Sequence, residues 1–165
     1  MGTVKRYMKG DVLQEAGQKR LNIYSVQKGL LRLYFSDTNG KDHNFMFASE
    51  GWTCGDVEAY AFDIEGTLTI EAIEDCEVEV FPPLALFQNN EQVEFRKMLR
   101  RAGALQRRVL MMMSTSALER YEHFLELYPE LTSRLTQRHI ASYLGITPQA
   151  LSKLRAQRVG KAYAS

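Results

Sequence analysis

The stretch LTQRHIASYLGITPQALSKLR, residues 135–155, contains two short helical patterns separated by Gly145. Thr136 stands where an N-cap would begin the first helix, and Gly145 can take the left-handed conformation that ends it. Thr147 is the corresponding cap of a second helix, with Pro148 at its first position. Two short helices joined by so tight a turn predict a helix-turn-helix.

The apolar and polar residues of this stretch fall on different faces of the predicted helices. Six apolar residues have the spacing of an inward face: Ile140, Ala141, Leu144, Ala150, Leu151 and Leu154. A helical hairpin that does not bind DNA would need no row of hydrogen-bond donors on its other side. We expect the outward donors to contact double-stranded DNA: Thr136, Gln137, Arg138, Thr147, Gln149, Ser152, Lys153 and Arg155.

The second helix, residues 147–156, is expected to lie in the major groove with its first residues toward the base edges. Gln149 can pair with adenine, and Lys153 or Arg155 can donate to guanine. Arg138 would neutralise phosphates, which holds a protein on DNA without specifying sequence. Two further residues are equally compatible with phosphate contacts: Thr147 and Ser152.

Charge is distributed unevenly along the 165 residues, although the formal net charge is only +1. Residues 1–90 hold eight Lys or Arg and 14 Asp or Glu, whereas residues 91–165 hold 13 and six. No acidic residue follows Glu130, but six basic residues do. An acidic first half and a basic second half predict two modules, the second of which meets a polyanion. A solvated basic face without a partner is the alternative.

The first half has the pattern of short antiparallel strands. Residues 23–35 are rich in β-branched and aromatic residues and contain Gly29, which is typical of a bend or a bulge. DTNG at 37–40 is a turn signal, and residues 43–48 are the expected partner strand. Residues 68–81 alternate between apolar and polar. We therefore expect an α+β protein that begins with an antiparallel β-barrel or sandwich.

A long helix is predicted over residues 91–113. Its apolar residues follow a heptad-like spacing of 4, 3, 4 and 3: Met98, Ala102, Leu105, Val109 and Met112. Such a seam can pack against the same helix of a second copy, which predicts a homodimer; packing against the chain's own core is the alternative. A further helix is predicted over residues 116–131, where Pro129 ends or kinks it.

The sequence contains no pattern for an enzyme, a metal or a cofactor. The three histidines, His43, His123 and His139, lie far apart, and no HExxH or glycine-rich phosphate loop occurs. Cys54 and Cys76 have no metal-ligand spacing. No apolar run approaches the ~18 residues of a membrane span, and the first residues lack the apolar block of a signal peptide. We expect a cytoplasmic protein that is not an enzyme.

The order of these parts resembles the Crp/Fnr family of bacterial transcription regulators. The likeness extends over nearly the whole chain, in KGDVLQEAG (9–17), IYSVQKGLLRLYF (23–35), EGWTCGD (50–56), IEAIEDCEVEVF (70–81) and residues 119–155. The pattern YPEL…IASYLGIT…LS is similar to the Bacteroidetes-type members. The resemblance implies three parts: a cyclic-nucleotide-binding-like jelly-roll barrel over 1–90, a dimerisation helix over 91–113 and a helix-turn-helix domain over 114–165.

The resemblance also implies a homodimeric DNA-binding regulator that reads a symmetric site, with half-sites about one helical turn apart. RNA polymerase and an unknown small-molecule effector are further candidate partners. The chain starts almost at the first expected strand, so we expect neither the preceding helices nor the iron–sulfur cysteines of some members. Little sequence follows the second helix, which leaves little for a wing.

The expected effector pocket departs from the family pattern. Cyclic-AMP-binding members hold the ribose with a Gly-Glu pair and the phosphate with an Arg-Ser/Thr pair. The matching positions here are Gly55-Asp56 and Gly66-Thr67. Without the arginine, a buried phosphate loses a strong charge-assisted pair, and the acidic residues nearby would repel an anion. We therefore expect another effector or none.

An alternative function is also consistent with the sequence. The barrel would be a small-molecule sensor, and its helical C-terminal domain would contact protein rather than DNA. Salt-dependent DNA binding distinguishes the two functions, because neutralising phosphates makes affinity fall steeply with salt.

Overall fold

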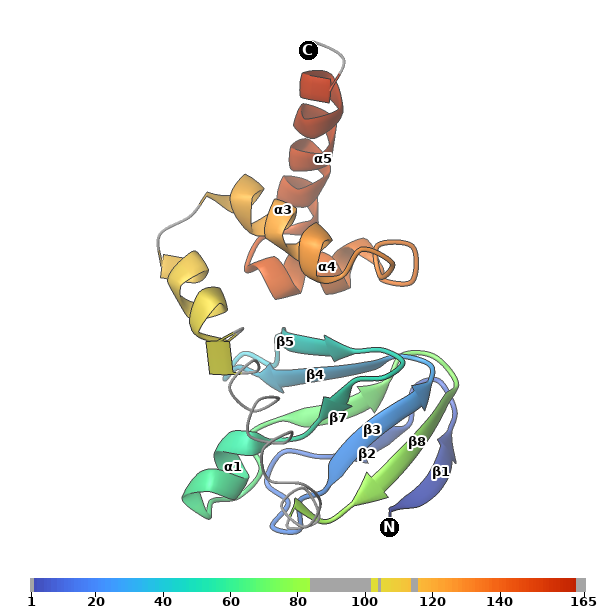
Figure 1. Cartoon of the computed structure of the whole chain (residues 1–165). Coiled ribbons are helices and arrows are strands. Elements are labelled where there is room, and N and C mark those ends of the chain that lie inside the picture. The colour runs from blue at the N-terminus through green and yellow to red at the C-terminus, as the bar shows by residue number, and fades with distance from the viewer. Residues whose placement is uncertain (1, 84–101, 104, 114–115, 163–165) are drawn as a thin grey trace. The chain divides into compact units, whose positions relative to one another are not determined.

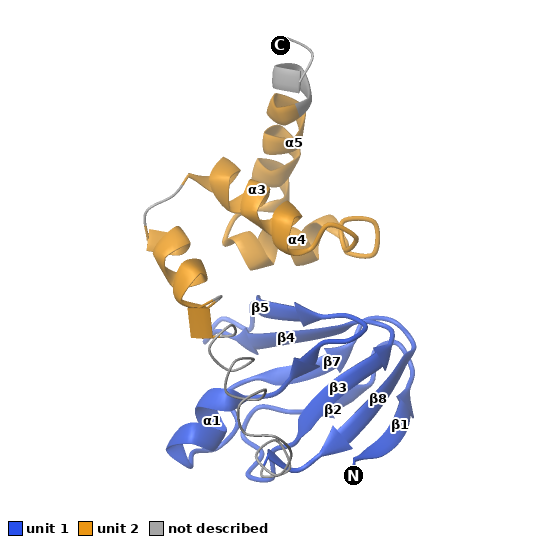
Figure 2. Cartoon of the chain, viewed as in Figure 1, with its two compact units in different colours: residues 1–96 blue, residues 97–165 orange. Residues whose placement is uncertain are grey.

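The computed structural model describes residues 2–83, 102–103, 105–113 and 116–162, and Figure 1 shows the helices and strands they form. The chain divides into two compact units, residues 1–96 and residues 97–165 (Figure 2). The described residues contain no helix with the length and apolar character needed to span a membrane.

The first unit contains two four-stranded antiparallel sheets. The strands of one sheet are, in spatial order, β1 (Thr3–Tyr7), β8 (Cys76–Phe81), β3 (Ile23–Lys28) and β6 (Thr53–Cys54). The strands of the other are β2 (Val12–Gln14), β7 (Thr69–Ala72), β4 (Leu31–Ser36) and β5 (Asp42–Ala48). The chain passes repeatedly between the two sheets, which is the connectivity of a jelly-roll-like fold.

Gly29 divides the predicted 23–35 stretch into β3 and β4, which belong to different sheets. Its φ of 95° lies in the left-handed region that favours glycine. A Cβ at this position would lie 2.5 Å from the backbone oxygen of Asp75 and 2.6 Å from Sγ of Cys76. The predicted bend is confirmed, and close packing as well as backbone conformation requires glycine there.

The predicted hairpin around residues 37–40 is confirmed. Strands β4 and β5 pair from Leu31 with Ala48 to Ser36 with Asp42. Within the turn, Oδ1 of Asp37 accepts hydrogen bonds from the backbone N–H groups two and four residues later, at 2.9 and 3.0 Å. Only Gly40 takes a positive φ in this turn, at 74°.

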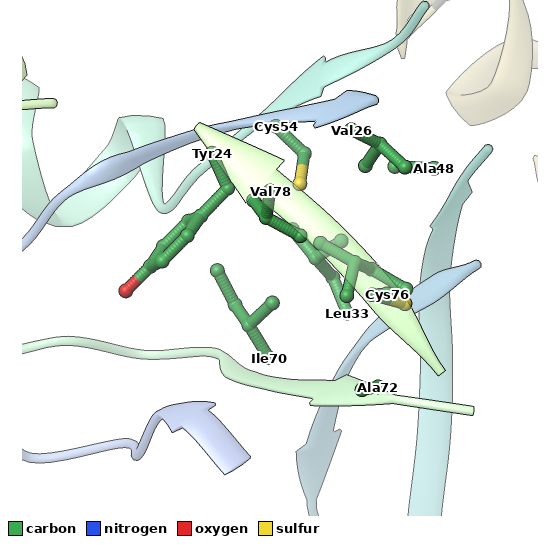
Figure 3. Packing of buried hydrophobic residues seen from close by; sticks show 10 residues of the cluster. Tyr24, Val26, Leu33, Ala48, Cys54, Ile70, Ala72, Cys76 and Val78 are labelled. Carbon is green, nitrogen blue, oxygen red and sulfur yellow. The ribbon is translucent and has the colours of Figure 1, made fainter. Parts of the chain in front are cut away.

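The core lies between the two sheets, where side chains from both point toward one another (Figure 3). Tyr24 and Val78 come from one sheet, and Leu33 and Ile70 come from the other. Burial of each large apolar side chain contributes about 1.5–3 kcal/mol. The Tyr24 hydroxyl donates to the backbone oxygen of Leu13 at 3.0 Å, and burial raises the pKa of Tyr24 to about 12. The alternation predicted for residues 68–81 produces this core and is confirmed.

A short helix, α1 (Val57–Phe62), was not predicted from the sequence. Its N-cap is Asp56, and it ends at Asp63, which takes left-handed φ and ψ of 52° and 46°. Six residues are too few to show a helical period, so only the cap could have indicated this helix.

The second unit contains a helical segment within 102–113 and three further helices: α3 (Ala117–Leu127), α4 (Gln137–Leu144) and α5 (Pro148–Ala162). Ser116 caps α3 in a reciprocal capping box with Glu119. The helix predicted over 116–131 is therefore confirmed, although it ends before Pro129. Much of the helix predicted over 91–113, including Met98, lies outside the described residues.

Candidate functional site

Asp56 organises the loop in which an effector pocket was predicted. Its side chain is 2% exposed, and its carboxylate accepts hydrogen bonds from the backbone N–H groups of Ala59, Thr67 and Leu68 at 3.2, 2.6 and 2.8 Å. The Thr67 hydroxyl lies 3.2 Å from each carboxylate oxygen. Asp56 therefore joins the start of α1 to the two residues that precede β7 (Thr69–Ala72).

Gly66, the position at which the resemblance led us to expect an arginine, is held closely by the segment before β3. Its N–H donates to the backbone oxygen of Gln18 at 2.8 Å, and its oxygen accepts from the N–H of Gly17 at 2.7 Å. An added Cβ would lie 3.2 Å from Cδ2 of Leu21 and 3.3 Å from the oxygen of Gln18. A side chain at this position would require these neighbours to move by a few tenths of an ångström.

The structure brings Asp56 and Thr67 of the predicted pocket into direct contact, and Gly55 and Gly66 are their sequence neighbours. The Asp56 carboxylate is already engaged by internal donors, and Oε2 of Glu58 lies 3.4 Å from the Thr67 hydroxyl. Two carboxylates therefore lie beside the Thr67 hydroxyl, and their negative charges would repel an anion placed there.

The second candidate site is the helix pair α4–α5. Oγ1 of Thr136 accepts the N–H of His139 at 3.2 Å, and Gly145 ends α4 with φ 69° and ψ 31°. Oγ1 of Thr147 accepts the N–H of Ala150 at 3.2 Å at the start of α5. The predicted caps and turn are confirmed. Four side chains from the predicted inward face are buried: Ile140, Ala141, Leu144 and Leu151.

Seven of the eight predicted DNA-contacting residues are exposed: Thr136, Gln137, Arg138, Thr147, Gln149, Ser152 and Lys153. Gln149 and Lys153 stand four residues apart on α5, so they lie on the same face of the helix. Ser152 links the two helices, because its hydroxyl donates to Oε1 of Gln137 at 3.3 Å. The pair thus presents hydrogen-bonding groups to solvent from both helices.

Arg155 differs from its predicted outward orientation. It is half-buried, and its Nε donates to the Tyr121 hydroxyl of α3 at 3.1 Å. Arg155 follows the buried Leu151 by four residues, so both lie on the inward face of α5. The helical spacing could have revealed this placement, but the residue type suggested a DNA contact instead.

Two arginines that were not predicted as functional bind the end of α4. Arg108 donates to the backbone oxygen of Tyr143 at 3.3 Å, and its guanidinium carbon lies 3.9 Å from the Tyr143 ring centroid. Nε of Arg120 donates to the oxygen of Leu144 at 3.2 Å. Cations at a helix C-terminus complement its partial negative charge. These contacts connect the 102–113 segment and α3 to the helix pair.

The predicted dimer seam is exposed where it is described. Ala102 is exposed, and four larger apolar side chains on this segment are 42–58% exposed: Leu105, Val109, Leu110 and Met112. Met113 is 80% exposed, whereas Met111 is only 7% exposed. Among the described residues, this segment therefore carries several apolar side chains that are about half exposed.

Comparisons with known proteins show similarity over nearly all of the chain. Residues 4–89 match the sequence family described as Cyclic nucleotide-binding domain. No curated protein sequence matches the chain. FixK2 from Bradyrhizobium japonicum has a similar structure, with a TM-score of 0.74 and 22% identity over 98% of this chain and 86% of that one.

Two other solved structures are also similar. A CRP/FNR-family transcriptional regulator from Thermus thermophilus has a TM-score of 0.70 and 19% identity, covering 98% of this chain and 88% of that one. A CooA mutant from Carboxydothermus hydrogenoformans has a TM-score of 0.68 and 21% identity, covering 94% and 75%. At these identities the likeness establishes the fold.

Proposed function

The chain belongs to the cyclic nucleotide-binding domain family, and from this premise we propose that it is a DNA-binding transcriptional regulator of the Crp/Fnr type. One observation carries the proposal: α4 and α5 present exposed hydrogen-bonding groups in a part of the sequence that has no acidic residue after Glu130. The regulators with a similar fold support it.

In the proposed mechanism, α5 enters the major groove of double-stranded DNA, and Gln149 and Lys153 face the bases. Gln149 can accept from and donate to adenine, and Lys153 can donate to guanine. Arg138 contacts the phosphate backbone from the first turn of α4. The hydroxyl oxygens of Thr136 and Thr147 accept backbone N–H groups, so their O–H groups remain able to donate to a phosphate.

The regulator acts as a homodimer in this proposal. The exposed apolar side chains of the 102–113 segment supply the surface for a second copy, with Ala102, Leu105, Val109 and Met112 in the seam. Met98 would extend the seam. A two-fold dimer would place two α5 helices on half-sites about one helical turn apart.

Cyclic AMP is not the effector in this proposal. The internal bonds of Asp56 and the tight packing around Gly66 support an effector other than cyclic AMP, or none. Calorimetry that detects cyclic AMP binding with micromolar or tighter affinity would overturn this part of the proposal.

Selection of bound sequences from a random double-stranded DNA library tests the proposed function. The wild-type protein should enrich a symmetric site, and Gln149→Ala should relax the preference at one base pair, at a cost of about 1–3 kcal/mol. Arg138→Ala should weaken binding to all sequences alike, because it removes a phosphate contact. The salt slope, which is the slope of the logarithm of DNA affinity against the logarithm of salt concentration, should decrease in magnitude by about 1.

Gln106→Ala is the matched control, because it removes the same side chain from an exposed position on the 102–113 segment. It should leave the selected sequence unchanged. Failure of the wild-type protein to bind DNA in a salt-dependent manner would overturn the proposal and favour a sensor whose helical unit contacts protein. An unchanged base preference in Gln149→Ala would overturn the role given to α5.

A further inference from the structure

Arg155 lies on the face of α5 that packs inward, although it is a charged residue in the DNA-proximal helix. It is half-buried and lies one helical turn after Leu151, which is fully buried. Gln149 and Lys153, in contrast, are exposed on another face. The position of Arg155 therefore separates it from the residues proposed to face the bases.

The partner of Arg155 is a buried group on a different helix. Tyr121 of α3 is 5% exposed, and its hydroxyl accepts the Nε–H of Arg155 at 3.1 Å. The guanidinium carbon lies 5.7 Å from the Tyr121 ring centroid, so the cation also lies near the aromatic ring. This contact joins α5 directly to α3.

Besides the bond to α3, the described part of α5 is held by the hydrogen bond from Ser152 to Gln137 of α4 and by apolar packing. Among the α5 side chains that the structure describes, Leu151 is the only buried one, and Ala150 and Leu154 are half-buried. Apolar packing is non-directional, whereas a hydrogen bond from a guanidinium has a defined geometry. Base-reading side chains must be held within about 0.5 Å of their productive positions.

We propose that Arg155 is a positioning residue, which sets the angle of α5 through the Tyr121 hydroxyl and so determines which bases Gln149 and Lys153 reach. Arg155 itself reads no base and neutralises no phosphate in this role. The inference rests on the proposed function, because it concerns how the same helix pair recognises DNA.

Tyr121→Phe separates this role from a direct DNA contact. The substitution removes only the hydroxyl oxygen, and Tyr121 is buried, so the change leaves the exposed surface of the helical unit almost unaltered. In the full-length protein, Tyr121→Phe and Arg155→Leu should each lower affinity for the selected DNA site by about tenfold. Both should alter the base preference in the same pattern without changing the salt slope. The double variant should be no weaker than either single variant, because both remove the same interaction.

Two further variants complete the experiment. Arg155→Lys keeps the positive charge but lacks the Nε–H, so it should resemble Arg155→Leu. Arg158→Leu removes an exposed cation from the same helix and should leave the base preference unchanged. A cooperative thermal unfolding transition of Tyr121→Phe, with a midpoint above the temperature of the binding assay, would show that the helical unit remains folded.

Three results would overturn the inference. If Tyr121→Phe kept the base preference of the wild type and Arg155→Leu had a lower salt slope, Arg155 would be a phosphate contact. If Arg155→Leu lost the base preference at a single base pair and Tyr121→Phe did not, Arg155 would contact that base directly. Nuclear magnetic resonance provides the third test without DNA: the Arg155 Nε–H should be protected from exchange in the wild type and exposed in Tyr121→Phe. Absence of that protection would show that the bond does not form.

This last measurement distinguishes failure of the inference from failure of the proposed function. A wild-type protein with the protected Nε–H that selects no DNA would defeat the regulator function, and the Arg155 bond would then have no positioning role in recognition.

Discussion

The two candidate sites use their polar groups in opposite ways. In the first unit, the Asp56 carboxylate is buried and accepts hydrogen bonds from Ala59, Thr67 and Leu68 of its own chain. In the second unit, Gln149 and Lys153 are exposed on the second helix of the pair. A group whose hydrogen bonds are satisfied internally stabilises the fold, whereas an exposed donor remains available to a partner. The comparison supports a structural role for the Asp56 carboxylate, and it leaves the polar groups of the helix pair available for the proposed recognition of DNA.

The charges near each site agree with this difference. The loop around α1 is acidic, with Glu58, Asp63 and Glu65 in the sequence beside Asp56. The helix pair lies in a part of the sequence with basic but no acidic residues. The acidic residues around the first site would repel an anion, and the basic residues after Glu130 would attract one.

Asp56→Ala should give the largest effect, because it would leave three backbone N–H groups of the loop without their acceptor. Each unsatisfied buried donor costs about 1–3 kcal/mol, so the first unit should lose about 3–5 kcal/mol of unfolding free energy. Trp52 is the only tryptophan of the chain and lies in the first unit, so its fluorescence during urea unfolding reports this loss.

Glu65→Ala is the matched control for Asp56→Ala, because it removes an exposed carboxylate from the same loop. Its only described ion pair is with exposed Lys19 at 3.8 Å, and such surface pairs contribute little. The control should shift the unfolding free energy by less than about 0.5 kcal/mol. If Asp56→Ala were as stable as the control, the carboxylate would be free for a ligand and the comparison would fail.

Arg108→Ala should give an intermediate effect in the second unit. It removes the hydrogen bond to the Tyr143 oxygen and the contact with the Tyr143 ring, which together contribute about 1–2 kcal/mol. Circular dichroism follows the helical unit during unfolding. Arg107→Ala, the exposed neighbour, should have almost no effect. Equal stabilities of the two variants would mean that Arg108 does not support the end of α4.

Features that depend on near neighbours were predictable from the sequence. The caps at Thr136 and Thr147, the left-handed turn at Gly145 and the bend at Gly29 are each encoded within a few residues. The alternation in residues 68–81 was likewise sufficient to identify the core face, because side chains in a strand alternate with a period of two.

Features that depend on distant partners were not predictable. Arg108 and Tyr143 are 35 residues apart, and nothing in the sequence near either one indicates the other. The donors bonded to Asp56 were hidden for the same reason, because they come mainly from the two residues that precede β7. Arg155 is a different case: its spacing from Leu151 indicated an inward position, but its charge favoured a DNA contact.

The smallest expected effect compares two carboxylates, the half-buried Asp37 in the first unit and the exposed Glu119 in the second. A hydrogen bond from His43, with Nε2 2.9 Å from Oδ2, is the main cause that lowers the pKa of Asp37, and backbone N–H groups of the turn add to it. The backbone N–H of Ser116 is the main cause that lowers the pKa of Glu119, followed by the Ser116 hydroxyl. A lowered folded-state pKa contributes stability above the ordinary carboxyl range, and this stability is lost as pH falls through the folded value.

In a carboxyl titration by nuclear magnetic resonance, His43→Ala should raise the pKa of Asp37 substantially. Ser116→Ala should raise that of Glu119 less, because its backbone N–H remains. A response of Asp37 to Ser116→Ala would show that the two units do not titrate independently.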